Sequence, residues 1–489
     1  MPALMIQQIE ENSNPKIDLN ASFVGTLKEL GVAKLLNKCG IRKTARTRSG
    51  EGACAKRTAY EIFQFLLLIA FQGCNLYRFL GSKKQDIACS KSTYQRFMGN
   101  EHYNWRRFIT LLASKIVGFL DTLTKPERFR ALVLDDSVIG RNRSKKVELL
   151  AFVFDHVINK TVRGFNLLTL GWTDGFSFIP LAFNMLTSAK KSKRFTEMNA
   201  DIDRRSVGFK NRRSAMLQKT DAAIAMVDDV LAAGIHARCI LMDTWFTNEP
   251  FIRRLLDRGL DVIGMLKDNR QMYHHRGRLY GLKALAAHFA RFNTPDNILG
   301  SVVVRTRRNN IPVRLVFVRN RNKRDEYIVI LSTDCSLSCS EVIRRYGYRW
   351  SIECCFKVCK SLLGLGSEFQ PVSYDVTVSS TALVLTRFLV LEWIRRKNSD
   401  FKSLGEIFFF CCDDVRDIEL SDALESLVSI MSDGLTNGEI QMSETVRKEI
   451  VDWYLSQPQF IRRICVCGMA AAGLMPIQKN QDAQMSTAA

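Results

Sequence analysis

The spacing of apolar residues predicts helices at the start of the chain. Over residues 22–122 apolar side chains recur three or four positions apart, as in Tyr60, Phe63 and Leu67. Because 3.6 residues make one helical turn, this spacing places them on a single helix face. We therefore expect residues 1–125 to form a helical region.

From residue 130 the pattern changes to that of a mixed α/β layer. The run 132–134 predicts a buried strand, and 164–183 predicts two strands joined by a turn at 173–175. A basic stretch at 203–213 is expected to be a loop. The remaining elements alternate between helix and strand. In order, they are a helix at 220–235, a strand at 238–243, a helix at 249–260 and a strand at 261–267.

A strand-rich, basic segment follows, and helical spacing then returns. The runs 301–308, 311–320 and 326–333 are typical of strands, whereas helical spacing resumes at Ser340 and includes a long helix at 380–396. We expect the α/β core to be divided by a β-rich insertion. The expected division is a helical DNA-binding region at 1–125, a core at 126–268, an insertion at 269–339, the second part of the core at 340–400 and a helical region at 401–489.

The charge balance favours a polyanionic partner. The chain has 71 Lys and Arg against 49 Asp and Glu, a formal net charge of +22. Such an excess repels itself unless a polyanion shares it, and nucleic acid is the obvious candidate. A basic protein that is merely soluble, or one that lies on an anionic membrane, has the same total. Several basic stretches fit a long polyanion better, namely 42–57, 204–219, 267–278 and 305–324.

Neither a membrane span nor a disulfide framework is expected. The apolar run 62–71 is short, and the run 382–394 is interrupted by Arg387 and Glu392. A helix that crosses a bilayer needs about 20 apolar residues. The 14 cysteines form no paired CxxC units and have no zinc-finger spacing, which indicates reduced thiols in a cytoplasmic protein.

Two acidic residues follow predicted buried strands. Asp135 comes directly after the run 132–134, and Asp243 ends the run that begins at Arg238. A carboxylate held at such a position is costly unless it binds a cation or a hydrogen-bond donor. Either residue alone is more often a helix cap or a turn residue. Asp136 leaves a further ambiguity, although Asp135 follows the apolar run directly.

A third carboxylate, Glu353, lies in a predicted amphipathic helix. At about 100° per residue, its polar stripe faces away from Ile352, Cys355, Cys359 and Leu363. An ordinary solvated face with a Glu–Lys pair is the plain alternative. A tyrosine and several basic residues around one carboxylate suit phosphate recognition beside a metal ligand. The stripe consists of Tyr346, Arg349, Glu353, Lys357 and Lys360.

Three carboxylates that converge from two strands and a helix can hold two divalent cations. Mg²⁺ prefers oxygen ligands and completes its shell with water and phosphate oxygens. Two such ions support in-line displacement at phosphorus, one at the attacking oxygen and one at the leaving oxygen. Asp135, Asp243 and Glu353 are therefore the candidate catalytic residues and metal ligands, with Mn²⁺ as an alternative ion. Motifs for other chemistry, such as a P-loop, G-x-S-x-G or HExxH, do not occur in the sequence.

These motifs resemble the DDE transposases of bacterial insertion sequences, in the group with the Tyr-Arg-Glu-Lys signature. Its spacing, Tyr-x2-Arg-x3-Glu-x6-Lys, is matched by Tyr346, Arg349, Glu353 and Lys360. The sequence LVLDDS at 132–137 is similar to the family's first motif, and Asp-Thr-Trp-Phe at 243–246 is similar to its second. The resemblance covers roughly residues 130–400.

The resemblance implies more than the residues alone establish. It implies an RNase H-like mixed-sheet core, Mg²⁺ dependence and cut-and-paste transposition by a homodimer bound to terminal inverted repeats. Phosphate contacts are implied for Tyr346, Arg349 and Lys360, and Lys357 shares their stripe. A nuclease or recombinase on the same fold, and a non-catalytic DNA-binding protein derived from a transposase, remain as alternatives.

Overall fold

A computed structural model describes most of the chain, which divides into two compact units, Met1–Phe409 and Phe410–Ala489. Most of the basic stretch predicted at 42–57 lies outside the described residues. The described residues are 23–42, 58–82, 89–123, 125, 127–268, 271–292, 297–320, 323, 326–398, 402–416, 443–456, 469 and 474.

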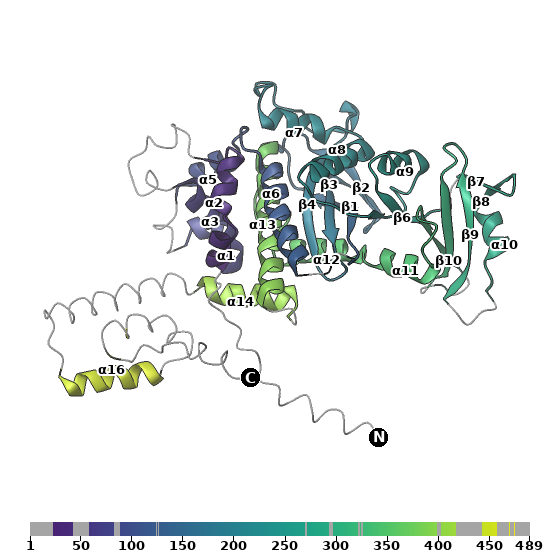
Figure 1. The fold of residues 1–489 in the computed structure, drawn as a ribbon. Coiled ribbons are helices and arrows are strands. Elements are labelled where there is room, and N and C mark those ends of the chain that lie inside the picture. Colours follow the sequence, from purple (N-terminus) through teal and green to yellow (C-terminus); the bar gives the residue numbers. More distant parts are fainter. Residues whose placement is uncertain are drawn as a thin grey trace, which may run out of the picture. The chain divides into compact units, whose positions relative to one another are not determined.

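The N-terminal region is helical, as predicted (Figure 1). Local sequence starts its helices: Thr58 and Glu61 form a capping box, and the Asn104 side chain accepts a hydrogen bond from the Arg107 N–H. Buried aromatic rings, including those of Phe63 and Trp105, hold the helices together. The elements are α1 (Phe23–Glu29), α2 (Val32–Lys38), α3 (Ala59–Leu68), the 3₁₀ helix η2 (Ile69–Gln72), α4 (Leu76–Leu80), α5 (Lys91–Met98) and α6 (Trp105–Thr122).

The core is a mixed sheet, which confirms the predicted α/β class. Its central strands lie in the order β4-β3-β1-β5-β6, with β4, β3 and β1 antiparallel and β1, β5 and β6 parallel. This arrangement is consistent with an RNase H-like core. The strands are β1 (Ala131–Gly140), β2 (Ala151–Asp155), β3 (Lys160–Thr173), β4 (Phe178–Leu186), β5 (Cys239–Met242) and β6 (Asp261–Leu266).

Two local predictions about this core were incomplete or wrong. The hairpin of β3 and β4 forms around the expected turn, but β2 was not predicted; it pairs with the first part of β3. The stretch 203–213 is not all loop, because α7 (Val207–Ala215) begins there with Ser206 as its cap. Arg212 is buried in this helix by partners that are remote in sequence. Local composition alone therefore could not indicate the helix.

The predicted insertion extends the same sheet. Strand β11 pairs with β6, and β10, β9, β7 and β8 continue outward from it. The three long strands were predicted from the sequence, whereas the short hairpin and the helix were not. The elements are β7 (Met272–His275), β8 (Arg278–Gly281), α10 (Leu282–Phe289), β9 (Ile298–Thr306), β10 (Pro312–Arg319) and β11 (Tyr327–Ser332).

Helices flank the core, and one of them is buried in the middle of the fold. Helix α13 contacts α6, α3 and α5 as well as β4, so it joins the N-terminal helices to the sheet (Figure 1). The other elements of this unit are η4 (Lys191–Lys193), α8 (Lys219–Ala232), α9 (Glu249–Leu256), α11 (Cys339–Gly347), α12 (Trp350–Ser361), α13 (Tyr374–Asn398) and α14 (Leu404–Arg416), which runs past the unit boundary.

Helix α13 has the length and composition of a membrane span but the burial of a core helix. Its apolar window has a mean hydropathy of 1.4, and 94% of that window is buried inside the protein. The charges that interrupt it are paired: Arg387 with Glu368, and Glu392 with Arg395. The helix is therefore the central element of a folded unit.

The second unit contains α16 (Glu444–Ser456), and Tyr454 of this helix and Met469 are buried against Ile450, Val451 and Leu474. The C-terminal region is thus helical in its described part, as expected.

One cysteine contradicts the prediction of reduced thiols. Cys89 is disulfide-bonded. Spacing along the chain does not reveal which cysteines the fold brings together, so the sequence could not exclude such a bond. Cys239, Cys355 and Cys359 are buried thiols, in line with the prediction.

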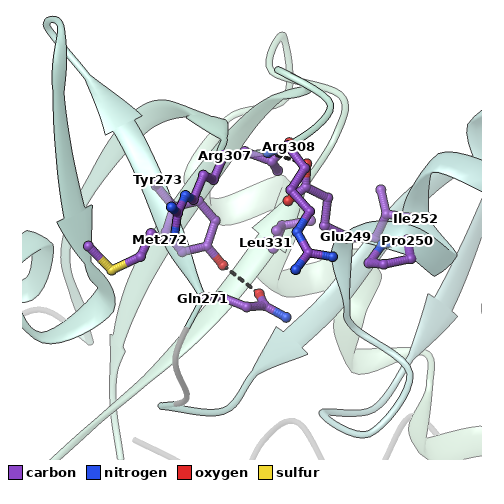
Figure 2. Close-up of a pocket in the computed structure, with 10 residues that line it drawn as sticks. Glu249, Pro250, Ile252, Gln271, Met272, Tyr273, Arg307, Arg308 and Leu331 are labelled. Carbon is purple, nitrogen blue, oxygen red and sulfur yellow. Dashed lines mark hydrogen bonds between the residues drawn. The ribbon is translucent and has the colours of Figure 1, made fainter.

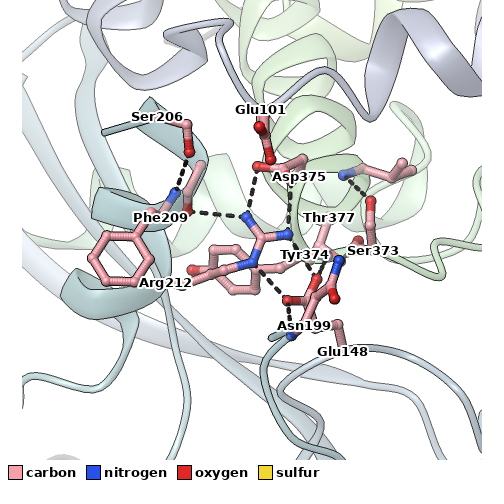
Figure 3. A network of polar contacts seen from close by, with 12 residues as sticks. Glu101, Glu148, Asn199, Ser206, Phe209, Arg212, Ser373, Tyr374, Asp375 and Thr377 are labelled. Atoms are coloured by element: carbon pink, nitrogen blue, oxygen red, sulfur yellow. Dashed lines mark hydrogen bonds and ion pairs between the residues drawn. The ribbon is translucent and has the colours of Figure 1, made fainter. Parts of the chain in front are cut away.

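A buried ionic network joins α7 to α13 and to the loop before β2 (Figure 3). The Arg212 side chain, only 2% exposed, forms two hydrogen bonds with the Glu148 carboxylate and two with that of Asp375. Glu148 also accepts from the backbone N–H groups of Asn199 and Tyr374. Burial alone raises the pKa of Glu148, but the hydrogen bonds from Arg212 and from these two N–H groups outweigh it and lower that pKa.

Replacing Arg212 should destabilise the fold strongly. In Arg212→Met two buried carboxylates lose their counter-ion, which typically costs about 3–5 kcal/mol in the free energy of unfolding. Urea unfolding followed by tryptophan fluorescence measures the loss. Arg205→Met is the matched control, because the Arg205 side chain is 93% exposed. Equal stability of the two variants would contradict the role assigned to the network.

The contribution of the network should depend on pH. A carboxyl group whose folded pKa is lowered stabilises the fold above its unfolded pKa, near 4.5 for Glu148, and loses that contribution as the pH falls. The stability gap between wild type and Arg212→Met should therefore narrow from pH 7 to pH 4. A gap of constant size in urea titrations across this range would show that Glu148 is not the group responsible.

Candidate active site

The register of two parallel strands brings the predicted aspartates together. Leu134 of β1 pairs with Met242 of β5, so the next residues, Asp135 and Asp243, are neighbours across the sheet. Asp243 follows the end of β5, as predicted. Asp135, however, is not at a strand end, because β1 continues to Gly140 against β3. Residues 131–134 are the part of β1 that pairs with both β3 and β5, and all four are buried.

Arg349 links two of the three predicted acids. Its Nη1 donates a hydrogen bond of 2.8 Å to Asp135 Oδ2, and its Nη2 donates to Glu353 Oε1. The Asp135 side chain is 15% exposed and that of Glu353 is 34% exposed. Burial raises the pKa of Asp135 to about 7, with Arg349 opposing the shift and Asp243 adding to it.

The Asp243 carboxylate is held by its own loop. Its Oδ1 accepts hydrogen bonds from the backbone N–H groups of Trp245, at 3.0 Å, and Phe246, at 3.4 Å. Burial raises the pKa of Asp243, although these donors oppose the shift. The loop packs closely on β6, where a Cβ at Gly264 would lie 2.3 Å from Thr247 Oγ1. The turn role considered for this residue is therefore real, and it fixes the carboxylate beside Asp135.

The polar stripe around Glu353 lies on two helices rather than one. Helix α11 ends at Gly347 and α12 begins at Trp350, which corrects the prediction of a continuous helix. The two residues between them, Tyr348 and Arg349, keep right-handed helical dihedrals. The regular helical hydrogen bonding is therefore interrupted between α11 and α12, but the stripe continues in nearly the same direction. On the opposite face, the predicted apolar side is buried, at Ile352, Cys355, Cys359 and Leu363.

Asp136 has a different partner from Asp135. Both carboxylate oxygens of Asp136 lie 2.8 Å from Lys219 Nζ, at the start of α8. The same ammonium lies 4.7 Å from the ring centroid of Trp245. In the sequence, Lys219 lies at the end of the basic stretch 204–219, which does not indicate this pairing. Contacts between residues so far apart in the chain leave no local signal.

The basic residues of the stripe line the same region. Lys360 Nζ donates to Ser137 Oγ at 2.7 Å and to the Val138 carbonyl at 3.2 Å, so it lies along β1 beyond Asp135. Lys357 is exposed on α12. Tyr346 is partly buried, its pKa is raised by burial, and the Arg349 guanidinium lies 5.8 Å from its ring centroid.

The three predicted acids are chemically suited to bind a cation, although their side chains are not arranged as a preformed metal site. Asp135 and Glu353 already share one cation, the Arg349 guanidinium, and Asp243 lies next to Asp135 on the neighbouring strand. Such an all-carboxylate set suits a hard divalent ion. Within the described residues, however, no three His, Cys, Asp or Glu side chains are grouped closely enough to hold a metal.

A cavity of about 510 Å³ lies where the insertion meets the core (Figure 2). Glu249, at the start of α9, accepts hydrogen bonds from the backbone N–H groups of Arg308, at 2.9 Å, and Asn309. Gln271 connects the cavity to the Asp243 loop through a 3.3 Å hydrogen bond to the Thr247 carbonyl. The cavity could not be recognised in the sequence, because its lining comes from four separate segments, at 249–252, 271–273, 306–308 and Leu331.

Comparison with known proteins gives a match to a family model over part of the chain. No curated protein matches the chain. Residues 66–307 match the family model described as DDE superfamily endonuclease. The matched region includes Asp135 and Asp243 and ends before Glu353. The match supports a DDE-type transposase family for this chain and a nuclease or transposase activity on DNA.

Proposed function

We propose that this protein is a DDE transposase that cuts and joins DNA in cut-and-paste transposition. The observation that supports the proposal is the Arg349 side chain, which bridges Asp135 and Glu353, while Asp243 lies next to Asp135 on the neighbouring strand. These acids come from β1, the end of β5 and α12. Their order, together with the complete Tyr-Arg-Glu-Lys spacing, supports the insertion-sequence group of the family.

The contacts favour Asp135 over Asp136 as the first catalytic acid. The Asp136 carboxylate is engaged at both oxygens by Lys219. Asp135 instead lies beside Asp243 and reaches Glu353 through Arg349. In this assignment Lys219 neutralises Asp136 and supports the ring of Trp245 next to the second catalytic acid.

Asp135, Asp243 and Glu353 would hold Mg²⁺, with two ions as the expected number and Mn²⁺ as a substitute. When bound, Mg²⁺ supplies activation of the attacking water or 3′-hydroxyl and stabilisation of the leaving oxygen. Arg349 keeps two of the acids paired in the DNA-free protein. Since a guanidinium binds phosphate as well as carboxylate, DNA offers Arg349 an alternative partner that leaves these acids available.

The same proposal assigns DNA-binding and assembly roles to other parts of the chain. Lys357, Lys360 and Tyr346 would contact the phosphate backbone near the cut. The helical region 1–125 would bind the terminal inverted repeats, and 401–489 would serve a homodimer that holds two element ends and the target DNA. The protein would act in the bacterial cytoplasm, on the nucleoid.

Two other functions differ from the proposal in testable ways. A nuclease or recombinase on this fold would cleave DNA without joining it to a target. A non-catalytic DNA-binding protein would have no use for the three acids, whose burial is costly. Inverted repeats on both sides of the coding region would favour transposition.

Removing any one of the three acids should abolish cleavage. Asp135→Asn, Asp243→Asn and Glu353→Gln keep the side-chain size but remove the charge that binds a metal. A loss of about 4 kcal/mol in transition-state stabilisation corresponds to roughly 1000-fold in rate. The assay is nicking of supercoiled plasmid with Mg²⁺. The control is Asp136→Asn, which should stay within about tenfold of wild type; normal cleavage by any of the three variants would refute the triad.

Replacing Lys360 should weaken DNA binding rather than chemistry. Lys360→Gln removes one expected phosphate contact, so the slope of log affinity against log salt should fall by about 1. Fluorescence anisotropy with a random-sequence duplex measures this slope. The matched control is Lys323→Gln, since Lys323 is 68% exposed and already paired with Glu326. An identical slope for both variants would remove Lys360 from the DNA-binding surface.

A further inference from the structure

An open groove of about 800 Å³ lies beyond the end of β1. The loop 140–147 forms one side, and residues between 366 and 372, which lead from α12 to α13, form the other. None of the basic stretches noted in the sequence includes this loop. Its composition is nevertheless distinctive, because four of the six residues 141–146 are basic.

The lining of the groove carries uncompensated positive charge. Arg141, Arg143, Lys145 and Lys146 line it, and its lining includes no acidic side chain. Arg143, Lys145 and Lys146 are exposed, and no ion pair joins any of the three to another described residue. These cations are therefore free to meet an external anion without first losing an internal partner.

The walls of the groove are held in place by hydrogen bonds. Arg141 Nη1 donates to the Gly366 carbonyl at 2.7 Å, which ties one wall to the other. The Glu148 N–H donates to the Val372 carbonyl at 2.9 Å, and the Glu148 carboxylate belongs to the Arg212 network of Figure 3. The loop is thus a preorganised surface, which reduces the entropy lost when a ligand binds.

Strand β1 connects the groove to the candidate active site. Asp135, Ser137 and Gly140 follow one another along it, and Lys360 lies over its middle at Ser137. Five residues of strand span about 17 Å at roughly 3.3 Å per residue. This distance corresponds to about five base pairs of duplex at 3.4 Å each. A DNA arm that leaves the carboxylates along β1 therefore arrives at the groove.

We propose that this groove binds the phosphate backbone of one DNA arm, about five base pairs from the scissile bond. The inference rests on the proposed function and adds a binding surface to it. Cations spread along a loop in an open groove suit an extended polyanion. Such contacts position DNA without reading its sequence.

The test is a charge-matched pair of triple variants. Arg143→Gln/Lys145→Gln/Lys146→Gln removes three cations from the groove. Arg253→Gln/Arg254→Gln/Arg258→Gln removes three cations that are already paired with Asp257, Asp221 and Asp228. Both change the net charge equally, so the control measures the effect of charge alone.

Anisotropy with a fluorescein-labelled random duplex of about 40 base pairs gives the affinity across a salt series. The groove variant should bind at least about tenfold more weakly near 150 mM salt, with a slope lower by about 2 to 3, whereas the control should remain near wild type. Plasmid nicking at saturating protein should retain the wild-type rate. If the two triple variants share one affinity and slope, the groove does not bind DNA.

Competition with inorganic phosphate tests whether the groove is instead a site for a small anion. Inorganic phosphate, compared with chloride at constant ionic strength, should not displace the duplex more strongly. Phosphate displacement that is specific to wild type and lost in the groove variant would indicate a discrete anion site and overturn the DNA proposal.

The binding and nicking assays separate the role of the groove from catalysis. If wild type binds the duplex but does not nick plasmid, the proposed function fails, while the comparison of the two triple variants still decides whether the groove binds DNA.

Discussion

The pairing of β1 with β5 imposes the central constraint on this molecule. The register that sets Leu134 opposite Met242 also makes Asp135 and Asp243 adjacent, on strands about 4.8 Å apart. Two carboxylates so close in a partly desolvated place repel each other, and burial raises both of their pKa values. The surrounding structure is organised to supply positive charge and N–H donors there.

The negative charge of each aspartate beside the β1–β5 pair is balanced by donors from a different element. Arg349 provides a guanidinium to Asp135, the loop after β5 provides N–H groups to Asp243, and Lys219 provides an ammonium to Asp136. Arg349 differs from the other two because it also reaches Glu353 and stands at the junction of α11 and α12. The same side chain that stabilises the acids therefore competes with any metal for them. In the proposed function, DNA phosphate would relieve this competition by attracting the arginine.

Much of this site could be predicted from the sequence because the patterns that indicate it lie within single helices and strands. The spacing of Tyr346, Arg349, Glu353 and Lys360 repeats with a helical period, and the buried side of the helix is equally regular. The strands of the hairpin and the long strands of the insertion carry apolar runs that alternate with turns. These features need no knowledge of distant residues.

What could not be predicted depends on partners far apart in the chain. Helix α7 forms where a charged loop was expected, since Arg212 finds its carboxylates 64 and 163 residues away. Strand β2 exposes Phe152 and Phe154 on one face, so its pattern lacks the signal of a buried strand. The pairing of Lys219 with Asp136 spans 83 residues. Periodicity within one element contains no information about such contacts.

The excess positive charge of the chain indicates a DNA-binding surface only after the buried, paired cations have been excluded. Arg387 is fully buried and bonded to Glu368 and to three backbone carbonyls, and Arg212 is bound by two carboxylates. Neither is available to DNA, although both count toward the net charge of +22. Basic residues whose surroundings contain no acid are different, and the loop 141–146 is such a place. A basic composition suggests nucleic acid, but the location of the contact follows from which cations the fold leaves uncompensated.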